Sequence, residues 1–378
     1  MTRDEVSRWE SERRLLTPFW QEHYAVSLGV PVERLRRAVI AAKAERRRAG
    51  SQDGQEDPVR RRQFIGAMTS LASPLVTGFD PAHQLIGAAD IQRLHRHTAR
   101  LRRLDDVLGG ADTYRTYANQ AEATSTLLNE ARYSERIGHG LRSLLAEHHQ
   151  MAGWAAFDSG HQSLARKHYL ASQAAAQEAD DVVLAGNSLS FLGYQETATA
   201  RDGTATATAS YEAARVVATP KVEALLLERL AFAHAVVGDA PQADTALERA
   251  REALSREDDR PEPDWVFWVD ESETDIMAGR CWTELRRPLR AVPVLESVLA
   301  GFSDTNGRDK ALYLTWLADS YVQAREVEQA ADTLVRAHDL AAGVASARPS
   351  ARITAVARKL ARHRSVPKVA TVLDQLAV

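Results

Sequence analysis

Residues 317–321 read Leu317-Ala318-Asp319-Ser320-Tyr321, and Ala330 and Leu334 follow them. A small residue is thus followed twelve positions later by Ala, and a larger apolar residue lies four positions beyond that Ala. Two antiparallel helices can approach closely only where small side chains face each other, while a bulky side chain one turn along fills the adjoining groove. The spacing therefore predicts a helical hairpin.

The same spacing recurs across residues 139–376. Three further copies keep the gap of twelve, and their small residue, Ala and larger residue are Gly153, Ala165 and Tyr169; Ala231, Ala243 and Leu247; Gly279, Ala291 and Leu295. A fifth copy has a gap of fourteen, which predicts two added turn residues, and its members are Gly193, Ala207 and Tyr211. Turn residues lie between the paired positions, as in Asp158-Ser159-Gly160, Asp202-Gly203 and Val237-Gly238-Asp239. One hairpin cannot cover its own apolar face, so we expect the hairpins to stack.

The pattern resembles the tetratricopeptide repeat family, in which a small residue and a tyrosine in the first helix precede an Ala-x3-large motif in the second. The steps between copies are 40, 38, 48 and 39 residues, and the longest contains the insert Arg260-Pro261-Glu262-Pro263-Asp264. These steps exceed the family period of about 34 and predict longer helices. The expected fold is all-α: an α-solenoid of tetratricopeptide-like hairpins over 139–378, with a small helical N-terminal remnant.

The chain before the repeats divides into three parts. Residues 1–48 are typical of short helices, 49–58 of a flexible polar linker, and 59–138 of a helical entry region. An apolar stripe in the entry region predicts a helix that ends at Gly109-Gly110, and the stripe consists of Ile91, Leu94, Thr98, Leu101, Leu104 and Leu108. We expect the Arg and His residues between these positions to form a solvated face.

The segment Val6-Ser7-Arg8-Trp9-Glu10 resembles the recognition helix of a lambda-repressor-like helix-turn-helix domain. The resemblance implies that Ser7 and Arg8 face bases and that Arg13 and Arg14 contact phosphates. The first two helices of such a domain would precede residue 1, and Glu12 and Leu16 depart from the family pattern. A helical remnant that only packs is the alternative. The order of head, linker and repeats resembles actinobacterial transcriptional regulators of the tetratricopeptide-repeat type.

The composition is that of a folded protein, and the charge distribution fits either a nucleic-acid contact or a solvated arginine-rich helix in the head. The 378 residues are 44% hydrophobic and 26% charged. Residues 1–63 carry 14 Lys and Arg against 10 Asp and Glu, a balance of +4, and the remainder carries −7, which together give the net −3. A single cysteine, Cys281, excludes an internal disulfide, and no run of 18 apolar residues occurs, so we expect a cytoplasmic protein without a membrane partner.

We find no pattern of catalytic or metal-binding residues, and we expect neither enzyme activity nor a cofactor. The adjacent pair His148-His149 points in two directions on a helix and cannot chelate one ion. Glu271, Glu273 and Asp275 are better explained as a solvated helix start than as paired acid–base groups. Cys281 is better explained as a buried small side chain than as a redox thiol.

The concave face of a solenoid is where a partner usually lies. The side chain one position after each small residue of a first helix should turn towards that face, which selects Trp154, Tyr194, Phe232, Arg280 and Asp319. They suit an extended peptide, a small signal or a protein, although Trp154 and Phe232 could equally be core between repeats. We expect a transcriptional regulator whose repeat body binds such a partner and controls a DNA-contacting head. The alternative is a protein–protein interaction scaffold without DNA binding, and a homodimer is left open in either case.

Overall fold

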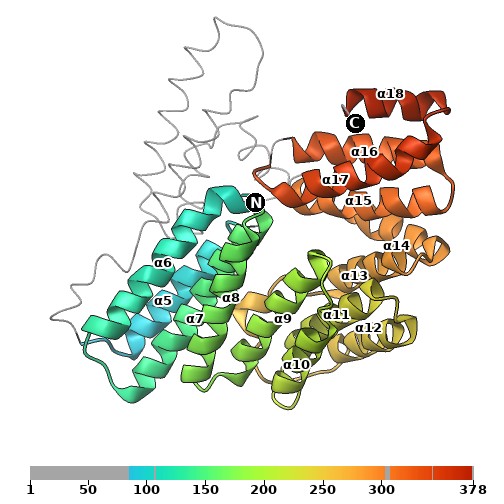
Figure 1. The fold of residues 1–378 in the computed structure, drawn as a ribbon. Helices are drawn as coiled ribbons and strands as arrows, with labels where there is room; N and C mark the ends of the chain where they lie inside the picture. Colours follow the sequence, from blue (N-terminus) through green and yellow to red (C-terminus); the bar gives the residue numbers. More distant parts are fainter. Residues whose placement is uncertain (1–84, 106–107, 303–306, 343, 377–378) are drawn as a thin grey trace, which may run out of the picture. The chain divides into compact units, whose positions relative to one another are not determined.

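The computed structural model describes residues 85–105, 108–302, 307–342 and 344–376, which belong to one compact unit, Pro74–Val378. This described part is all-α, which confirms the expected fold class (Figure 1). Its α-helices are α5 Ala88–Arg102, α6 Gly110–Glu130, α7 Glu135–Asp158, α8 Gln162–Glu178, α9 Val182–Ala198, α10 Thr204–Ala214, α11 Pro220–Val236, α12 Ala240–Leu254, α13 Glu271–Glu284, α14 Pro288–Gly301, α15 Gly307–Gln323, α16 Val327–Ala341, α17 Ala347–Leu360 and α18 Pro367–Gln375. Two short 3-10 helices, η2 Asp264–Val266 and η3 Ala361–His363, complete the list. The expected head, linker and first part of the entry region lie outside these residues.

The helices pack mainly as consecutive pairs, so the unit is a helical-hairpin repeat array. The hairpins are α7 with α8, α9 with α10, α11 with α12, α13 with α14 and α15 with α16. The first helix of each hairpin also contacts the first helix of the next, and α17 continues this row by packing on α15. The row α7, α9, α11, α13, α15 and α17 is called the inner layer below.

The small residues of the repeated pattern lie where the paired helices touch. A Cβ added to Gly153 would lie 2.5 Å from Cε1 of Tyr169, and one added to Gly279 would lie 2.5 Å from Cγ of Leu295. These partners are the large residues that the spacing selected. The alanines of the second helices are equally buried, with exposed fractions of 0–1% at Ala165, Ala207, Ala243, Ala291 and Ala330. The predicted register of the hairpins is therefore confirmed.

The turns between paired helices use left-handed backbone at one residue. Gly160 and Gly238 have φ of +89° and +84°, as expected for glycine after a helix end. Arg286 and Arg325 take the same region at +56° and +66° without being glycine. The turn between α9 and α10 spans Thr199 to Gly203, two residues more than the turn between α7 and α8, which confirms the interpretation of the longer gap.

The expected end of the first described helix is wrong. α5 ends at Arg102, before Leu104 and Leu108, and Gly109 precedes α6 instead of ending α5. A Cβ on Gly109 would lie 2.2 Å from the carbonyl oxygen of Ala345, and the amide of Ala111 donates to that oxygen at 3.2 Å. The glycine is needed for this approach of a distant segment rather than for a helix stop.

None of the helices described is both long enough and apolar enough to cross a membrane.

Candidate ligand-binding surfaces on the inner layer

Four of the five residues selected for the concave face come together, but Tyr194, Phe232 and Arg280 are only 2–4% exposed. Phe232 belongs to the main hydrophobic core and Trp154 packs against it, as the core alternative expected. Trp154 lies on α7, Tyr194 on α9, Phe232 on α11 and Arg280 on α13. The ring centroids of Trp154 and Tyr194 are 6.1 Å apart, and those of Tyr194 and Phe232 are 5.8 Å apart. The Arg280 guanidinium lies 4.6 Å from the Phe232 ring centroid. Because each residue has the same register in its hairpin, the stacking of first helices forms one continuous group.

Arginine side chains cover the faces of these aromatic rings. Arg280 is 2% exposed, lies 4.3 Å from the Trp316 ring centroid and donates from Nη2 to the Tyr194 hydroxyl at 2.7 Å. Arg229 of α11 lies 4.4 Å from the Tyr194 ring centroid. Cations are attracted to ring faces, most strongly where water is excluded.

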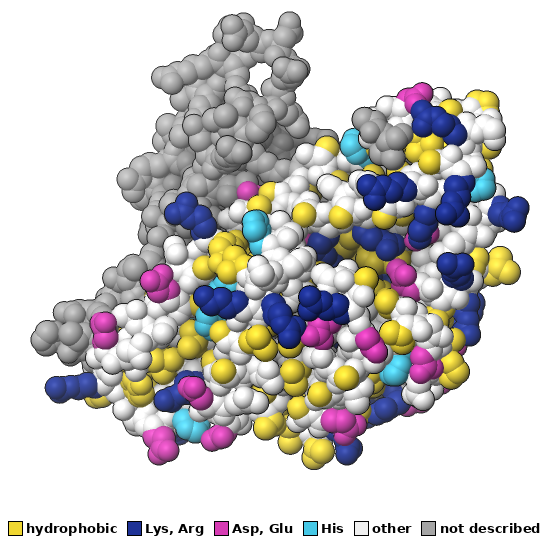
Figure 2. All heavy atoms as spheres, in the orientation of Figure 1, with side chains coloured by type: hydrophobic (Ala, Val, Ile, Leu, Met, Phe, Trp, Pro, Cys, Tyr) yellow, Lys and Arg dark blue, Asp and Glu magenta, His cyan; other side chains and the backbone are white. Residues whose placement is uncertain are grey.

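Helix α17 brings further cations back to the first repeats. Arg348 lies 4.7 Å from the Trp154 ring centroid, and its Nη2 donates to the Tyr194 hydroxyl at 2.8 Å. The hydroxyl of Ser346 donates to Asp158 at 2.8 Å, which fixes the start of α17 against the end of α7. Figure 2 shows Lys and Arg side chains gathered around a hollow with apolar side chains inside it. We call the following residues the arginine–aromatic cluster: Trp154, Tyr194, Arg229, Phe232, Arg280, Trp316 and Arg348.

Asp319, the fifth selected residue, makes different contacts. Its carboxylate accepts from Nζ of Lys359 at 2.7 Å and lies 3.6 Å from Nη2 of Arg352, both on α17. It is 2% exposed, so these two cations neutralise it within the protein. Asp319 thus helps to attach α17 to α15.

The cluster strongly affects the ionisation of Tyr194. Burial alone would raise the pKa of this phenol, but Arg280, Arg348 and Arg229 together lower it to about 8. A cationic environment favours the charged form of a neighbouring acid. The site is therefore one where a negative charge is stabilised.

The pKa values of two carboxyl groups beside the cluster are raised, in contrast to the lowered pKa of Tyr194. Burial raises the pKa of Glu228 to about 7, and burial together with Glu228 raises the pKa of Glu273 to about 8. Both accept hydrogen bonds from hydroxyl groups: Thr274 donates to Glu228 at 2.5 Å, and Tyr313 donates to Glu273 at 2.9 Å. With these pKa values, Glu273 is mainly protonated and Glu228 about half protonated near neutral pH, so the two carboxyls balance the arginines only in part.

This corrects the expectation that Glu271, Glu273 and Asp275 form a solvated helix start. Glu271 is exposed, and Asp275 forms an ion pair at 3.0 Å with Arg251. Glu273, however, is 9% exposed and lies against α15, because it occupies the inner side of α13. Sequence reasoning could not see this, since the covering helix comes some forty residues later.

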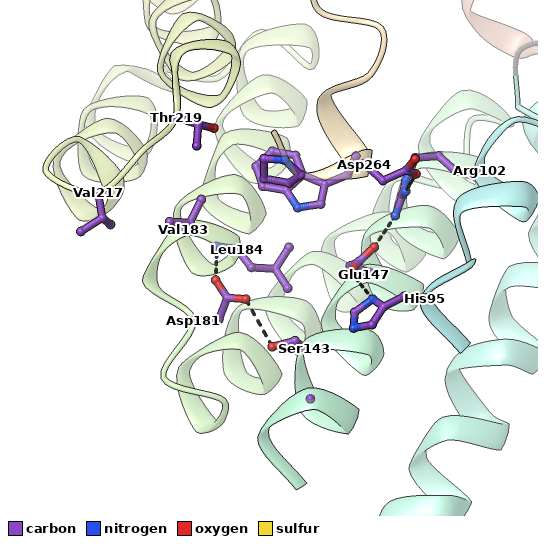
Figure 3. A pocket seen from close by; sticks show the side chains of 13 residues that line it. His95, Arg102, Ser143, Glu147, Asp181, Val183, Leu184, Val217, Thr219 and Asp264 are labelled. Atoms are coloured by element: carbon purple, nitrogen blue, oxygen red, sulfur yellow. Dashed lines mark hydrogen bonds and ion pairs between the residues drawn. The ribbon is translucent and has the colours of Figure 1, made fainter. Parts of the chain in front are cut away.

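A second surface, not foreseen from the sequence, is a pocket of about 470 Å³ at the other end of α7. Figure 3 shows side chains from α5, α7, α9 and the segment before α13 pointing into it. We call it the acidic pocket, and it is lined by His95, Arg102, Gly140, Ser143, Glu147, Asp181, Val183, Leu184, Val217, Thr219, Pro263, Asp264 and Trp265.

A chain of ion pairs crosses one wall of the acidic pocket. Arg102 pairs with both Glu147 and Asp264, and His95 Nδ1 lies 3.6 Å from Glu147 (Figure 3). Burial would raise the pKa of Glu147, but Arg102 and His95 lower it to about 2. The carboxylates of this wall are therefore neutralised by cationic side chains of the protein itself.

The insert before α13 separates the acidic pocket from the arginine–aromatic cluster. Trp265 lines the pocket, whereas Trp268 lies 5.7 Å from the guanidinium of Arg229 in the cluster. Nε1 of Trp268 donates to the carbonyl of Trp265 at 3.0 Å, and Val266 between them is fully buried. The proline-containing insert that lengthens one repeat step is the only sequence signal that pointed to this segment.

The remaining candidate residues lie elsewhere. Cys281 is fully buried in the core, as interpreted from the sequence. The ring of His148 contacts Thr98 and Thr124, while His149 faces His168, so the two histidines point apart as expected. The proposed DNA contacts, Ser7, Arg8, Arg13 and Arg14, lie outside the described residues.

Comparison with models of known families and with curated proteins found no match for this chain. The fold itself defines the class: an all-helical protein of stacked consecutive helix pairs.

Proposed function

We propose that the inner layer binds a peptide, small signal or protein partner through an anionic group placed at the arginine–aromatic cluster. The observation that carries this proposal is the convergence of three guanidinium groups on the Tyr194 hydroxyl and ring. Carboxylates and phosphates are recognised by arginine because its planar fork can donate two hydrogen bonds at once.

Charge balance supports an anion as the bound group. Arg229, Arg280 and Arg348 meet in the cluster, and of these Arg348 has the Asp158 carboxylate 3.7 Å away. The neighbouring Glu228 and Glu273 have pKa values raised to about 7 and about 8. Nε of Arg280 is buried and has no hydrogen-bond partner among the described residues. Buried charges are costly unless they are paired, so a bound carboxylate would relieve an imbalance that the free protein retains.

Regulation of transcription is the second part of the proposal. Its support is the resemblance of Val6-Ser7-Arg8-Trp9-Glu10 to a recognition helix, the +4 balance of residues 1–63 and the tetratricopeptide-like spacing of the body. In this reading the repeat body senses the partner and the head contacts DNA. An interaction scaffold without DNA binding is the alternative.

Partner binding is tested with the full chain and two pools of hexapeptides, one with free C-terminal carboxylates and one with C-terminal amides. Calorimetry should show tighter binding of the free acids by about tenfold, the contribution expected of a charge-assisted contact. Arg348→Met should remove this preference, whereas Arg358→Met on the exposed side of α17 should keep it. Equal binding of both pools, or equal effects of both variants, contradicts the anionic site.

DNA binding is tested separately with duplex DNA fragments at increasing salt concentration. The regulator should bind with an affinity that falls steeply with salt, and Arg8→Ala should weaken binding because a phosphate or base contact is lost. Absence of salt-dependent binding would favour the scaffold without affecting the anionic site.

A further inference from the structure

The acidic pocket contains one carboxylate, Asp181, whose hydrogen-bond donors among the described residues are all neutral. Asp181 accepts from the amide of Leu184 at 2.9 Å and from the hydroxyl of Ser143 at 3.2 Å, and both donors are neutral. Across the part of the chain that the structure describes, Asp181 forms no ion pair. Figure 3 shows these two contacts at one side of the pocket, away from the ion pairs of Glu147 and Asp264.

The wall around Asp181 is mainly apolar. Val183, Leu184 and Val217 line the pocket, and Trp265 of the insert adds an indole. Leu184 is 2% exposed and packs in a buried cluster against which Trp265 also lies, so this wall is firmly held. An aromatic ring face and aliphatic side chains beside one carboxylate can bind a ligand with an apolar body and one positive charge.

The charges of the whole lining agree with a cation. Glu147 and Asp264 are paired with Arg102, and Asp264 also with Arg103. Asp181 is the lining carboxylate that forms no ion pair among the described residues. An anionic ligand would be repelled, and a neutral apolar ligand would leave Asp181 without a counterion. A metal ion is disfavoured because the described residues bring together no group of three His, Cys, Asp or Glu side chains suited to hold one.

We propose that the acidic pocket binds a small organic cation, with its ammonium group at Asp181 and its apolar body between Val217 and Trp265. This site is distinct from the arginine–aromatic cluster and takes a ligand of opposite charge, so the proposal does not depend on the function proposed above. The insert that carries Trp265 also contacts α5 and α11, so a cation in the pocket binds where three parts of the chain meet.

The charge requirement is tested with phenethylamine and the neutral phenethyl alcohol, titrated into the full chain by NMR or tryptophan fluorescence. We expect the amine to bind with a dissociation constant in the millimolar range, as is usual for a small fragment, and about tenfold tighter than the alcohol. Equal binding of the two compounds, or no saturable binding of the amine, would overturn the proposal.

Two matched substitutions locate the charge. Asp181→Asn keeps the side-chain cap of α9, because Asn caps helices as well as Asp, and should weaken amine binding about tenfold. Asp180→Asn removes the neighbouring carboxylate, which is 85% exposed and outside the pocket, and Asn tolerates its φ of +55°. It should leave binding unchanged, and an equal loss in both variants would mean that only the general negative potential attracts the amine.

A second pair of variants tests the position of the ligand without touching the cap. Val217→Lys places a cation at the rim of the pocket, where the side chain is 43% exposed, and should abolish amine binding by repulsion. Val216→Lys adds the same charge at a position that is 82% exposed and does not line the pocket. If the two lysines weaken binding equally, the amine does not bind in this pocket.

Discussion

Glu147 in the acidic pocket and Glu228 beside the arginine–aromatic cluster are carboxyl groups on two inner-layer helices, and both are largely removed from solvent. Their pKa values nevertheless move apart: that of Glu147 is lowered to about 2, and that of Glu228 is raised to about 7. Arginine is close in both regions, so the presence of a guanidinium does not by itself determine the outcome.

The difference lies in what each guanidinium contacts. Arg102 forms ion pairs directly with Glu147 and Asp264, so its charge neutralises carboxylates. Arg280 faces the rings of Phe232 and Trp316, and Glu228 receives its hydrogen bond from Thr274 instead. Burial raises the pKa of a carboxyl that has no ion-pair partner, whereas a guanidinium in direct contact with a carboxylate lowers its pKa. The pocket wall is internally neutralised, and the cluster retains positive charge.

The largest expected effect is at the pocket. Glu147→Gln should lower the free energy of unfolding near neutral pH by about 3 kcal/mol, because the pKa of Glu147 falls from 4.5 to about 2 on folding and one unit is worth about 1.4 kcal/mol. A lowered folded-state pKa gives stability that is present above 4.5 and is lost as the pH falls towards 2. Urea unfolding of both proteins at several pH values measures this.

The difference between wild type and Glu147→Gln should therefore shrink as the solution is acidified. Glu178→Gln is the control, because its ion pair with Arg142 is solvent-exposed and should contribute less than about 1 kcal/mol. A Glu147→Gln variant as stable as the control would remove the proposed contrast between the two regions.

The next largest expected effect is a gain in stability rather than a loss. Glu273→Gln should raise the free energy of unfolding in mildly alkaline solution by about 2 kcal/mol, because glutamine replaces a carboxyl that the fold keeps protonated. A raised folded-state pKa gives stability that is complete below 4.5 and is lost as the pH rises through about 8. The wild type should thus lose more stability than the variant between mildly acidic and mildly alkaline solution.

Glu271→Gln, on the exposed side of the same helical turn, should leave the pH profile of unfolding as in the wild type. Denaturation midpoints measured in mildly acidic and in mildly alkaline solution distinguish the outcomes. A Glu273→Gln profile parallel to the wild type would show that this carboxyl ionises normally in the folded protein.

The smallest effect compares two glycines of α7, one in each region. Gly153→Ala should destabilise the protein by about 1 to 2 kcal/mol, because its Cβ would overlap the buried ring of Tyr169. Gly140→Ala in the pocket should be neutral or stabilise by about 0.5 kcal/mol, because its nearest neighbour, Cγ2 of Ile91, is 3.4 Å away and alanine favours a helix. Thermal unfolding of both variants provides the measurement, and equal losses would show that α7 packs as tightly at the pocket as at Tyr169.

The sequence predicted more of the cluster than of the pocket. Trp154, Tyr194, Phe232 and Arg280 were selected from one register position, and the structure brings them into contact. Repetition makes such a prediction possible, since stacking identical hairpins places equivalent residues in one row. Whether these residues bind a partner stays a prediction.

The acidic pocket lacked any comparable signal. Its Asp264 comes from a non-repeated insert and reaches Arg102, more than 160 residues earlier, through an ion pair. The same applies to Gly109, whose role depends on the carbonyl of Ala345 rather than on the helix before it. Local patterns carry no information on which distant segment will be their neighbour.

By itself, the sequence determined the all-helical class, the hairpin register and the row of inner-layer residues, because each depends on side-chain size at fixed helical spacings. Only the tertiary structure decided the return of α17 to the first repeats, the packing of the insert and the ionisation of Glu147, Glu228 and Glu273. These features depend on burial and on charges brought together from distant segments, and a pattern within one segment does not encode them.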